Sequence, residues 1–486
     1  MTDAPRDPRL FALTAAAARD AIEVVRSIQG GDGFILNYLE YPHLSWFDSG
    51  LPHLSTYRSE NVPHYRDAYR RGSGDSKRVD FAELESFKQL QNYCLQSDRI
   101  RSRFVHGRKA KDVRERFVRI SADLLAEQLM ERFLHLHDKA EVTDTLLLPI
   151  YLPLEAPVLE DELKFDVVVP IVVMHFPDVT EKTIVESVTL RRLSDQEHLA
   201  RWPLGPSTTE SVNATVLSAA THAFVLTGHT VPANKWAERY SDAIDMPWRQ
   251  IDLAFDALRV VTGARTGYAQ VLVDPKGWAD DYVADLPPLI RGPQVRRYPE
   301  SLEKWGWMNK GSSVELPQLP EVGETLRVLS EDSHLQMAAR RFSSSLLGSD
   351  EDDAVVDLCT CLEIMLTDDT KTEIRHKLRL RAAAVIAESY PGVDARVVFD
   401  GMDDVYNLRS FVLHGSKSTK KKKDLHKMKW GSGELQTVDV ARWIAQTVLQ
   451  WTIRRGQLVA ATQIDRELIL DALTQSPTPS DDDDSS

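Results

Sequence analysis

Cysteine is scarce in this sequence. Only three of the 486 residues are cysteines, and their spacing matches no known metal-ligand pattern. Cys359 and Cys361 fall two positions apart in a helical pattern, which disfavours a disulfide bond between them, and Cys94 lies far away. We therefore expect free thiols in a reducing compartment, which indicates a cytoplasmic protein.

The sequence also shows no pattern typical of a targeting or membrane segment. The first 25 residues lack the basic start and apolar stretch of a signal peptide. The longest apolar run, FDVVVPIVVMHF (165–176), is too short to cross a bilayer as a helix. The sequence predicts no association with a membrane.

Common catalytic signatures are absent as well. The sequence contains no Walker, Rossmann or Gly-x-Ser-x-Gly motif, and GYAQVLVDPKGW (267–278) has no phosphate-binding glycine pattern. His135 and His137 alternate with apolar residues in a helical segment, which favours packing over metal binding. We expect neither a metal nor another cofactor.

Charge is abundant but uneven. The net charge of −14 argues against a protein that coats nucleic acid over its whole surface. Residues 476–486 end in SDDDDSS and are predicted to form an acidic, disordered tail. By contrast, GSKSTKKKKDLHKMKW (415–430) carries seven lysines and one aspartate. The basic charge is therefore concentrated in one short segment.

The periodicity of apolar residues predicts an α+β protein of several domains. Helices are expected at 10–30 and 81–137, within a mainly helical region at 1–140. A mixed α/β domain is expected at 141–325. Its predicted strands are TLLLPIYL (145–152), FDVVVPIVVMHF, TIVESVTLRRL (183–193) and THAFVLTGH (221–229). A helix at 248–263 should end at Gly263, and the proline-rich 314–325 predicts a boundary.

The carboxy-terminal third is predicted to be an all-helical bundle at 330–475. Serine and acidic residues at the starts of helices and glycine or proline at their ends indicate five helices. Their expected ranges are 333–348 with a Ser333 cap, 351–367, 371–390, 393–415 and 437–456.

Four ordered segments of this third resemble the HEPN superfamily, with Apea-like HEPN proteins as the most similar group. The segments are ARRFSSSLL (339–347), AVVDLCTCLEIMLT (354–367), EIRHKLRLRAAAVIAE (373–388) and VYNLRSFVLHGS (405–416). The resemblance covers roughly 333–460. It implies an up-and-down helical bundle and, in active members, a metal-independent endoribonuclease with paired Arg-x4–6-His motifs at a dimer interface. It also implies a role in bacterial defence against phage.

Carried onto this sequence, the motif names Arg409 and His414 as catalytic residues. Asn407, Ser410 and Glu363 are supporting candidates. Many active members have Asn, Asp or His after the arginine, whereas Ser410 stands there in this chain. The lysine segment could hold the RNA backbone without reading its sequence, through Lys417, Lys420, Lys421, Lys422 and Lys423.

The spacing Arg-x4-His is not specific by itself. It also occurs as Arg101/His106 and Arg132/His137, and most such matches are helix ends in which a basic residue lies near the negative pole. The first of these pairs could alternatively mark a degenerate second HEPN module, although the surrounding helices do not repeat the signature.

Helical geometry distinguishes the two residues of the motif. At about 100° per residue, Arg409 falls at the centre of the arc formed by Val398, Met402, Val405 and Val412. A guanidinium there must pair with a carboxylate such as Glu363, or open onto a cleft that binds phosphate. His414 falls about 140° away on a straight helix. Both can serve one phosphate only if the helix unwinds at Gly415 or if two subunits contribute.

Two functions remain open from the sequence. The first is an RNA-cleaving homodimer, joined through the bundle, in which the mixed region senses a trigger or restrains the nuclease. The second is a non-catalytic HEPN module for dimerisation or RNA binding, with Arg409 in a structural role. Ser410 favours the second function, and the adjacent lysine segment favours the first.

Overall fold

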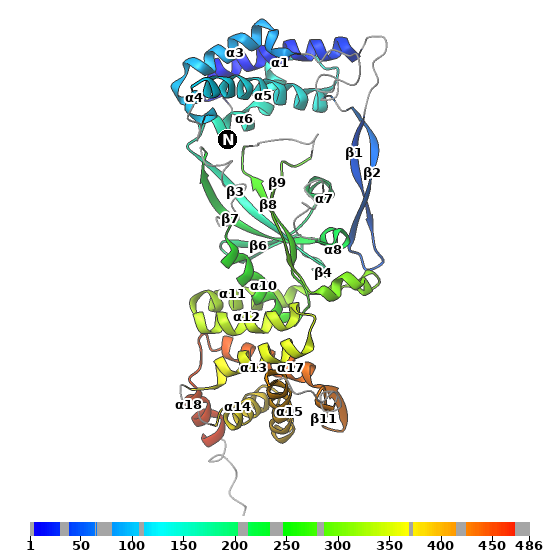
Figure 1. Cartoon of the computed structure of the whole chain (residues 1–486), viewed down its shortest axis with the longest axis vertical. Helices are drawn as coiled ribbons and strands as arrows, with labels where there is room; N and C mark the ends of the chain where they lie inside the picture. Colours follow the sequence, from blue (N-terminus) through cyan, green and yellow to red (C-terminus); the bar gives the residue numbers. More distant parts are fainter. Residues whose placement is uncertain are drawn as a thin grey trace, which may run out of the picture. The chain divides into compact units, whose positions relative to one another are not determined.

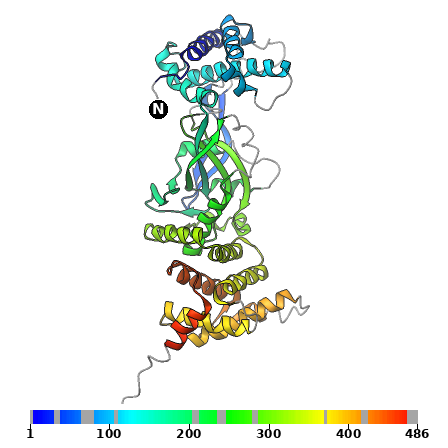
Figure 2. The same ribbon diagram turned by 90° about the vertical axis from the view of Figure 1, so that its left-hand side faces the viewer.

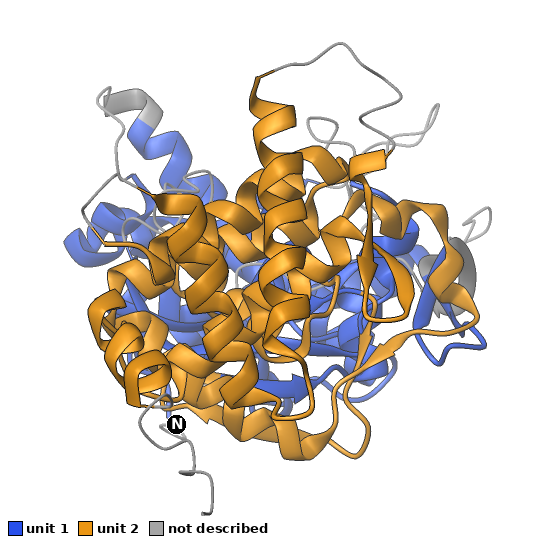
Figure 3. Cartoon of the chain, turned by 90° about the horizontal axis from the view of Figure 1, so that it is seen from below, with its two compact units in different colours: residues 1–172, 189–246, 268–296 blue, residues 173–188, 247–267, 297–486 orange. Residues whose placement is uncertain are grey.

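A computed structural model describes residues 4–29, 38–63, 65, 80–105, 111–202, 212–233, 246–278, 286–368, 373–414 and 424–471. The chain forms two compact units (Figure 3). Unit 1 comprises residues 1–172, 189–246 and 268–296, and unit 2 comprises residues 173–188, 247–267 and 297–486. The prediction of a mixed α+β protein with more than one part is confirmed. The finer division at 140 and 325 stays a prediction.

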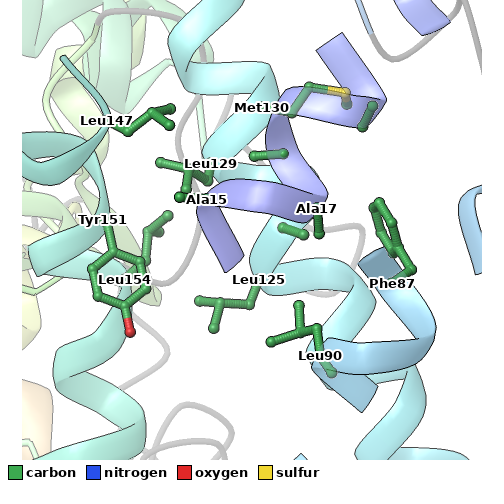
Figure 4. Close-up of a cluster of buried hydrophobic side chains, with 14 of the residues drawn as sticks. Ala15, Ala17, Phe87, Leu90, Leu125, Leu129, Met130, Leu147, Tyr151 and Leu154 are labelled. Carbon is green, nitrogen blue, oxygen red and sulfur yellow. The ribbon is translucent and has the colours of Figure 1, made fainter. Parts of the chain in front are cut away.

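Unit 1 contains a group of helices around one apolar core. They are α1 (Pro8–Gln29), η1 (Phe81–Glu83), α3 (Glu85–Gln96), α4 (Asp98–Phe104), α5 (Lys111–His137) and α6 (Asp144–Leu159). Figure 4 shows the core, in which Ala15 and Ala17 of α1 lie near Leu125, Leu129 and the other labelled side chains. Because alanine is small, α1 can pack closely against α5 and α3.

The segment 145–152 was predicted to be a strand, and this prediction is wrong. It lies in helix α6, which contains Pro149, Pro153 and Pro157. The three prolines are four residues apart and therefore share one side of the helix, with Pro149 exposed. Proline has no backbone N–H, so the carbonyl four residues before it loses its donor in the helix. On the exposed side water can donate to that carbonyl instead. The buried side, including Leu147 and Tyr151, packs on the core and stabilises the helix despite the prolines.

The sheet of unit 1 contains five neighbouring strands in the order β6-β7-β3-β8-β9 (Figures 1 and 2). Their bounds are β3 Glu162–Ile171, β6 Val188–Arg192, β7 His222–Pro232, β8 Tyr268–Pro275 and β9 Ile290–Arg297. Strand β3 is antiparallel to both β7 and β8, which places its valine run at the centre. The strands predicted at 165–176, 183–193 and 221–229 are confirmed, the second as β6 and the preceding β5 (Glu181–Val185).

A long hairpin that the sequence did not predict belongs to the same unit. Strands β1 (Tyr38–Trp46) and β2 (Pro52–Pro63) pair antiparallel and form a two-stranded ribbon, blue in Figure 1. They contact the short helices α7 (Asp195–Arg201) and α8 (Ala214–Ser218). Leu51 and Leu54, near the turn, are buried.

A fully buried arginine joins α7 to α8. Arg201 donates from Nη1 to the carbonyl of Leu217 (2.8 Å) and from Nη2 to that of Ser218 (2.6 Å). It also donates from Nε to Nδ1 of His198 (3.3 Å). Burial, followed by the charge of Arg201, lowers the pKa of His198 to about 2, so this histidine is neutral. Its Nδ1 can then accept a hydrogen bond from Nε of Arg201. The other N–H groups of the same guanidinium satisfy the carbonyls at the end of α8.

Unit 2 is mainly helical. Its main helices are α10 (Trp248–Thr262), α11 (Leu319–Glu331), α12 (Ser333–Leu347), α13 (Glu351–Leu366), α14 (Ile374–Ser389), α15 (Ala395–Leu413) and α17 (Thr437–Ile453). Short turns are η4 (Glu300–Lys304), η5 (Gly306–Met308), η6 (Leu316–Gln318), α18 (Ala461–Ile464) and the π-helix η7 (Asp465–Leu470). Helix α12 packs on α13, and α14 packs on α15. Helix α17 contacts α12, α13, α14 and α15.

Several details of these helices follow from the sequence, and others do not. Helix α10 ends at Gly263 as predicted, and the φ of 66° at this residue shows a left-handed cap. The cap of α12 is Asp332 rather than the predicted Ser333, since the Asp332 carboxylate accepts from His334 and Leu335 N–H groups. The proline-rich 314–325 forms η6 and the start of α11, where Pro320 occupies a first-turn position that needs no N–H donor.

Two small pairs of strands complete unit 2. Strand β4 (Met174–His175) pairs in parallel with β10 (Ser312–Ser313). Strands β11 (Lys427–Trp430) and β12 (Gly433–Gln436) form a hairpin between α15 and α17, in a region that the sequence predicted only as a charged loop.

Replacing Arg201 by methionine should destabilise the protein. Arg201→Met keeps an apolar chain of similar length but leaves the buried carbonyls of Leu217 and Ser218 without their donors. We expect a loss of about 2–4 kcal/mol in the free energy of unfolding, measured by urea denaturation. Arg327→Met is the control, because the Arg327 side chain is 49% exposed and pairs with the exposed Glu324 and Glu331 on α11. Equal stability of Arg201→Met and wild type would contradict this role.

Asp123 should make stability depend on pH. Burial raises the pKa of Asp123 to about 6, although Gln91 donates a hydrogen bond to its carboxylate (2.7 Å). Since the folded-state pKa exceeds the unfolded value, this group favours folding below about pH 4 and loses that contribution as pH rises to about 6. Asp123→Asn should therefore stabilise the protein at pH 7.5 by about 1 kcal/mol, allowing for solvent screening. Thermal unfolding between pH 4 and 8 tests this, with the exposed Asp20→Asn as the control.

Candidate functional site

Helix α15 carries the motif predicted from the sequence. The Asp394 carboxylate caps the helix by accepting from the Arg396 N–H. Val398, Met402, Val405 and Leu408 form its buried side. The helix continues to Leu413, and His414 caps its end with φ −88° and ψ 0°. The described part of the motif is thus regular helix.

Arg409 is half-buried between α15 and α13. Its Nη2 lies 3.2 Å from Oε1 of Glu363, and the two side chains are 23% and 24% exposed. Nε of Arg409 is buried and finds no hydrogen-bond acceptor in the described part of the chain. The pair with Glu363 is the contact expected from the sequence. The guanidinium nevertheless keeps an unused buried donor and partial exposure to solvent.

His414 does not lie beside Arg409. It is exposed at the end of α15, where its backbone N–H donates to the carbonyl of Ser410 (3.1 Å). Arg409 and His414 are five positions apart on a regular helix, so their side chains point about 140° apart. Gly415, where unwinding could bring them together, lies outside the described residues. Within one described chain, the structure does not assemble the two residues into a site.

Tyr406 lies near Arg409 and Arg375 lies near Tyr406, and the sequence analysis missed both residues. Cζ of Arg409 is 5.4 Å from the centre of the Tyr406 ring, and Cζ of Arg375 is 5.9 Å from it. Arg375, at the start of α14, forms two hydrogen bonds with the Asp403 carboxylate (2.7 and 2.6 Å). Tyr406 precedes Arg409 by three positions, so helical spacing could have indicated that they share a face.

Asn407, one of the supporting candidates, has a partner other than Arg409. Nδ2 of Asn407 donates to Asp403 (3.4 Å), and Arg379 also lies 2.9 Å from Asp403. The hydrogen bond from Arg375, with the charges of Arg379 and Arg375, keeps the pKa of Asp403 below its usual value. Asp403 therefore remains ionised and fixes the α14–α15 contact, with Asn407 as part of that contact rather than of the Arg409 pocket.

The lysine segment begins directly after His414. Lys417 and Lys420–Lys423 lie outside the described residues. The chain after them is anchored, because Nε2 of His426 lies 3.1 Å from Asp352 at the start of α13. Lys427 and Lys429 alternate with the buried Met428 and are exposed on β11.

Trp430 holds the β11–β12 hairpin against the bundle. Its ring packs edge-on against Trp443 of α17, with ring centres 5.8 Å apart. It also covers Gly401 of α15, where an added Cβ would meet the ring at 2.5 Å. Glycine at 401 is therefore needed for this close approach, and the hairpin fixes where the lysine segment rejoins the bundle.

The other two copies of the motif have structural contacts. Arg101 forms an ion pair with Asp98 and donates to the carbonyl of Leu95 (3.1 Å), while His106 lies outside the described residues. His137 of the third copy packs on the Phe133 ring, with centres 5.1 Å apart. Arg101 thus acts within its own helical region.

The described residues contain no metal-binding cluster, no helix that could span a membrane and no reactive thiol. No group of three or more His, Cys, Asp or Glu residues suited to a metal occurs within the described ranges. No helix in those ranges is long and apolar enough to span a membrane. The three cysteines are buried and free, and burial raises the pKa of Cys94 and Cys359 to about 12, so neither is a ready nucleophile.

No family model, curated protein or solved structure gives a significant match to this chain.

Substituting Gly401 should disturb the hairpin next to the lysine segment. Gly401→Ala places a methyl group against the Trp430 ring. We expect a loss of about 1–3 kcal/mol in unfolding free energy from overpacking, although alanine is the better helix former. Gly392→Ala is the matched control, because its added Cβ meets nothing within 4 Å. Combining Gly401→Ala with Trp430→Ala should remove the extra penalty. A Gly401→Ala protein as stable as wild type would show that the contact is not needed.

Proposed function

We propose that this chain is a metal-independent endoribonuclease of the HEPN type that acts as a homodimer. Support comes from helices α12, α13, α14 and α15, which coincide in order with the four segments that resemble this family. The observation that carries the proposal is Arg409. Its side chain is partly exposed and contacts one carboxylate through Nη2, so the guanidinium keeps N–H donors that no described residue accepts from.

The chemistry needs a phosphate-binding group and a group that transfers protons. Arg409 holds the scissile phosphate and stabilises its developing negative charge. His414 takes the proton of the 2′-hydroxyl or protonates the leaving 5′-oxygen, because an imidazole can both accept and donate a proton. The 2′-oxygen forms a bond to phosphorus as the bond to the 5′-oxygen breaks. The products are a 2′,3′-cyclic phosphate and a 5′-hydroxyl.

The geometry of α15 favours a site shared by two copies of the chain. Arg409 and His414 point about 140° apart on one regular helix. A twofold dimer brings Arg409 of one copy towards His414 of the other. Glu363 then serves as a positioning residue that holds the Arg409 guanidinium, and the lysine segment after His414 binds the RNA backbone. The biological role that we propose is an anti-phage or toxin-type effector in the bacterial cytoplasm.

A non-catalytic HEPN module is the second candidate. Two observations favour it: the Glu363–Arg409 ion pair, and Ser410 at the position after the arginine. In that case Arg409 stabilises the α13–α15 contact, and the bundle mediates dimerisation or RNA binding.

RNA cleavage in the presence of excess EDTA distinguishes the two candidate functions. Purified protein should cleave structured or single-stranded RNA, and Arg409→Ala and His414→Ala should each slow cleavage by about 100-fold or more. Arg101→Ala is the control, because it removes the arginine of a motif copy that has structural contacts. A His414→Ala protein that cleaves as fast as wild type, or wild type that cleaves no RNA, supports the non-catalytic module.

Mixing the two inactive variants tests the shared site. After exchange of subunits, half of the dimers contain one copy of each variant, and one of their two sites has both Arg409 and His414. Mixing Arg409→Ala with His414→Ala should thus restore about a quarter of wild-type activity. No recovery from fully exchanged dimers, or a strictly monomeric active enzyme, would contradict the shared site.

A further inference from the structure

Tyr406 presents a hydroxyl group on the same side of α15 as Arg409. The two residues are three positions apart, which places them about 60° apart around the helix. The ring centre lies 5.4 Å from Cζ of Arg409 and 5.9 Å from Cζ of Arg375. The Tyr406 ring therefore lies beside the guanidinium groups of both arginines, of which Arg375 is already bound to Asp403.

Glu363 and Asp403 already have partners, whereas the Tyr406 hydroxyl has none among the residues that the structure describes. Glu363 lies against Arg409, and Asp403 is bound by Arg375 and Arg379. No hydrogen bond joins the Tyr406 hydroxyl to any residue that the structure describes, and the side chain is partly exposed. The hydroxyl is thus available to donate to a ligand held by Arg409.

Other polar groups near the motif are less suited to this contact. His414 points about 140° away from Arg409, and Ser410 about 100° away. Asn407 donates to Asp403 (3.4 Å). Tyr406 is therefore the hydroxyl group of α15 best placed to share a ligand with Arg409.

We propose that the Tyr406 hydroxyl donates a hydrogen bond to a non-bridging oxygen of the RNA phosphate that Arg409 binds. This inference rests on the proposed ribonuclease function and adds a catalytic residue to it. Tyr406 keeps its proton throughout, because it stabilises charge on the phosphate and does not act as acid or base. Each hydrogen bond spans about 2.8 Å, so the two oxygens of one phosphate can reach the hydroxyl and the guanidinium together.

The test is Tyr406→Phe, which keeps the ring against Arg409 and removes only the hydroxyl. The substrate is a mixed-sequence single-stranded RNA oligonucleotide in excess EDTA, cleaved under single-turnover conditions. We expect cleavage to slow by about 10- to 100-fold, as for loss of a hydrogen bond to a charged group. Tyr390→Phe is the control, because Tyr390 is 43% exposed at the end of α14 and its ring packs on Trp443. It should cleave like wild type.

Replacing a non-bridging oxygen of the scissile phosphate by sulfur distinguishes direct contact of Tyr406 with the phosphate from a structural role of this residue. Wild type should cleave one of the two phosphorothioate diastereomers at the scissile phosphate more slowly than the oxygen substrate, because sulfur is the weaker acceptor. In Tyr406→Phe that additional penalty should disappear. A slow Tyr406→Phe protein with an unchanged sulfur effect would show that the residue acts only through Arg409, and would overturn the inference.

The remaining outcomes distinguish the inference from the proposed function. If wild type cleaves RNA and Tyr406→Phe cleaves within twofold of it, the inference fails and the ribonuclease proposal stands. If wild type cleaves no RNA, the ribonuclease proposal fails and the role of Tyr406 fails with it.

Discussion

Hydrogen bonds from arginine to the carboxyl ends of helices hold each unit of this protein together. The last carbonyls of a helix lack donors within the helix, and they must find donors elsewhere when they are buried. Arginine suits this task because it offers five N–H groups and favours the negative end of the helix dipole. The contacts join Arg26 to Asp138 and Ala140, Arg103 to Glu160, Arg201 to Leu217 and Ser218, Arg265 to Leu346 and Gly348, and Arg381 to Leu366. Several link segments far apart in sequence, such as Arg265 and Leu346, which are 81 residues apart.

Because arginine has this structural role at several places in the chain, an arginine in a motif does not by itself indicate a functional site. Arg101 has the spacing of a ribonuclease motif, yet it binds the carbonyl of Leu95 and the carboxylate of Asp98. Arg381 lies in a segment that resembles the family, and its guanidinium is enclosed by Asp465, Asp368 and the Leu366 carbonyl. Arg409 differs from both, because among the described residues it contacts one carboxylate and one aromatic ring and no backbone carbonyl. Its environment, rather than its spacing, makes it a candidate for binding phosphate.

Much of the fold could be predicted because its signals are local. The valine run of β3 and the glycine that ends α10 depend on neighbouring residues, and both were read correctly. Helix α6 could not be read this way, since its stability comes from burying Leu147 and Tyr151 against other helices despite three prolines. Strands β11 and β12 depend on the fit of Trp430 over Gly401, a contact between residues that the sequence places 29 positions apart.

Glu363 was found as a partner of Arg409 because a half-buried guanidinium requires a carboxylate. Tyr406 was overlooked because an aromatic residue on an apolar helix is usually packing.

The regularity of α15 determines how the proposed site must be divided. Between Arg409 and His414 the helix advances by about 7.5 Å and turns by about 140°, so a regular helix directs the two side chains to different sides of α15. In the proposed site, Arg409 and Tyr406 would form the phosphate-binding half, with Glu363 of α13 holding the Arg409 guanidinium. His414 belongs to the opposite side, and the lysine segment follows it directly. In a twofold dimer, RNA held by the phosphate-binding half of one copy would meet the histidine and the lysines of the other. Such an arrangement makes cleavage depend on dimerisation, because separating the copies removes both the proton-transfer group and the basic segment from the bound phosphate.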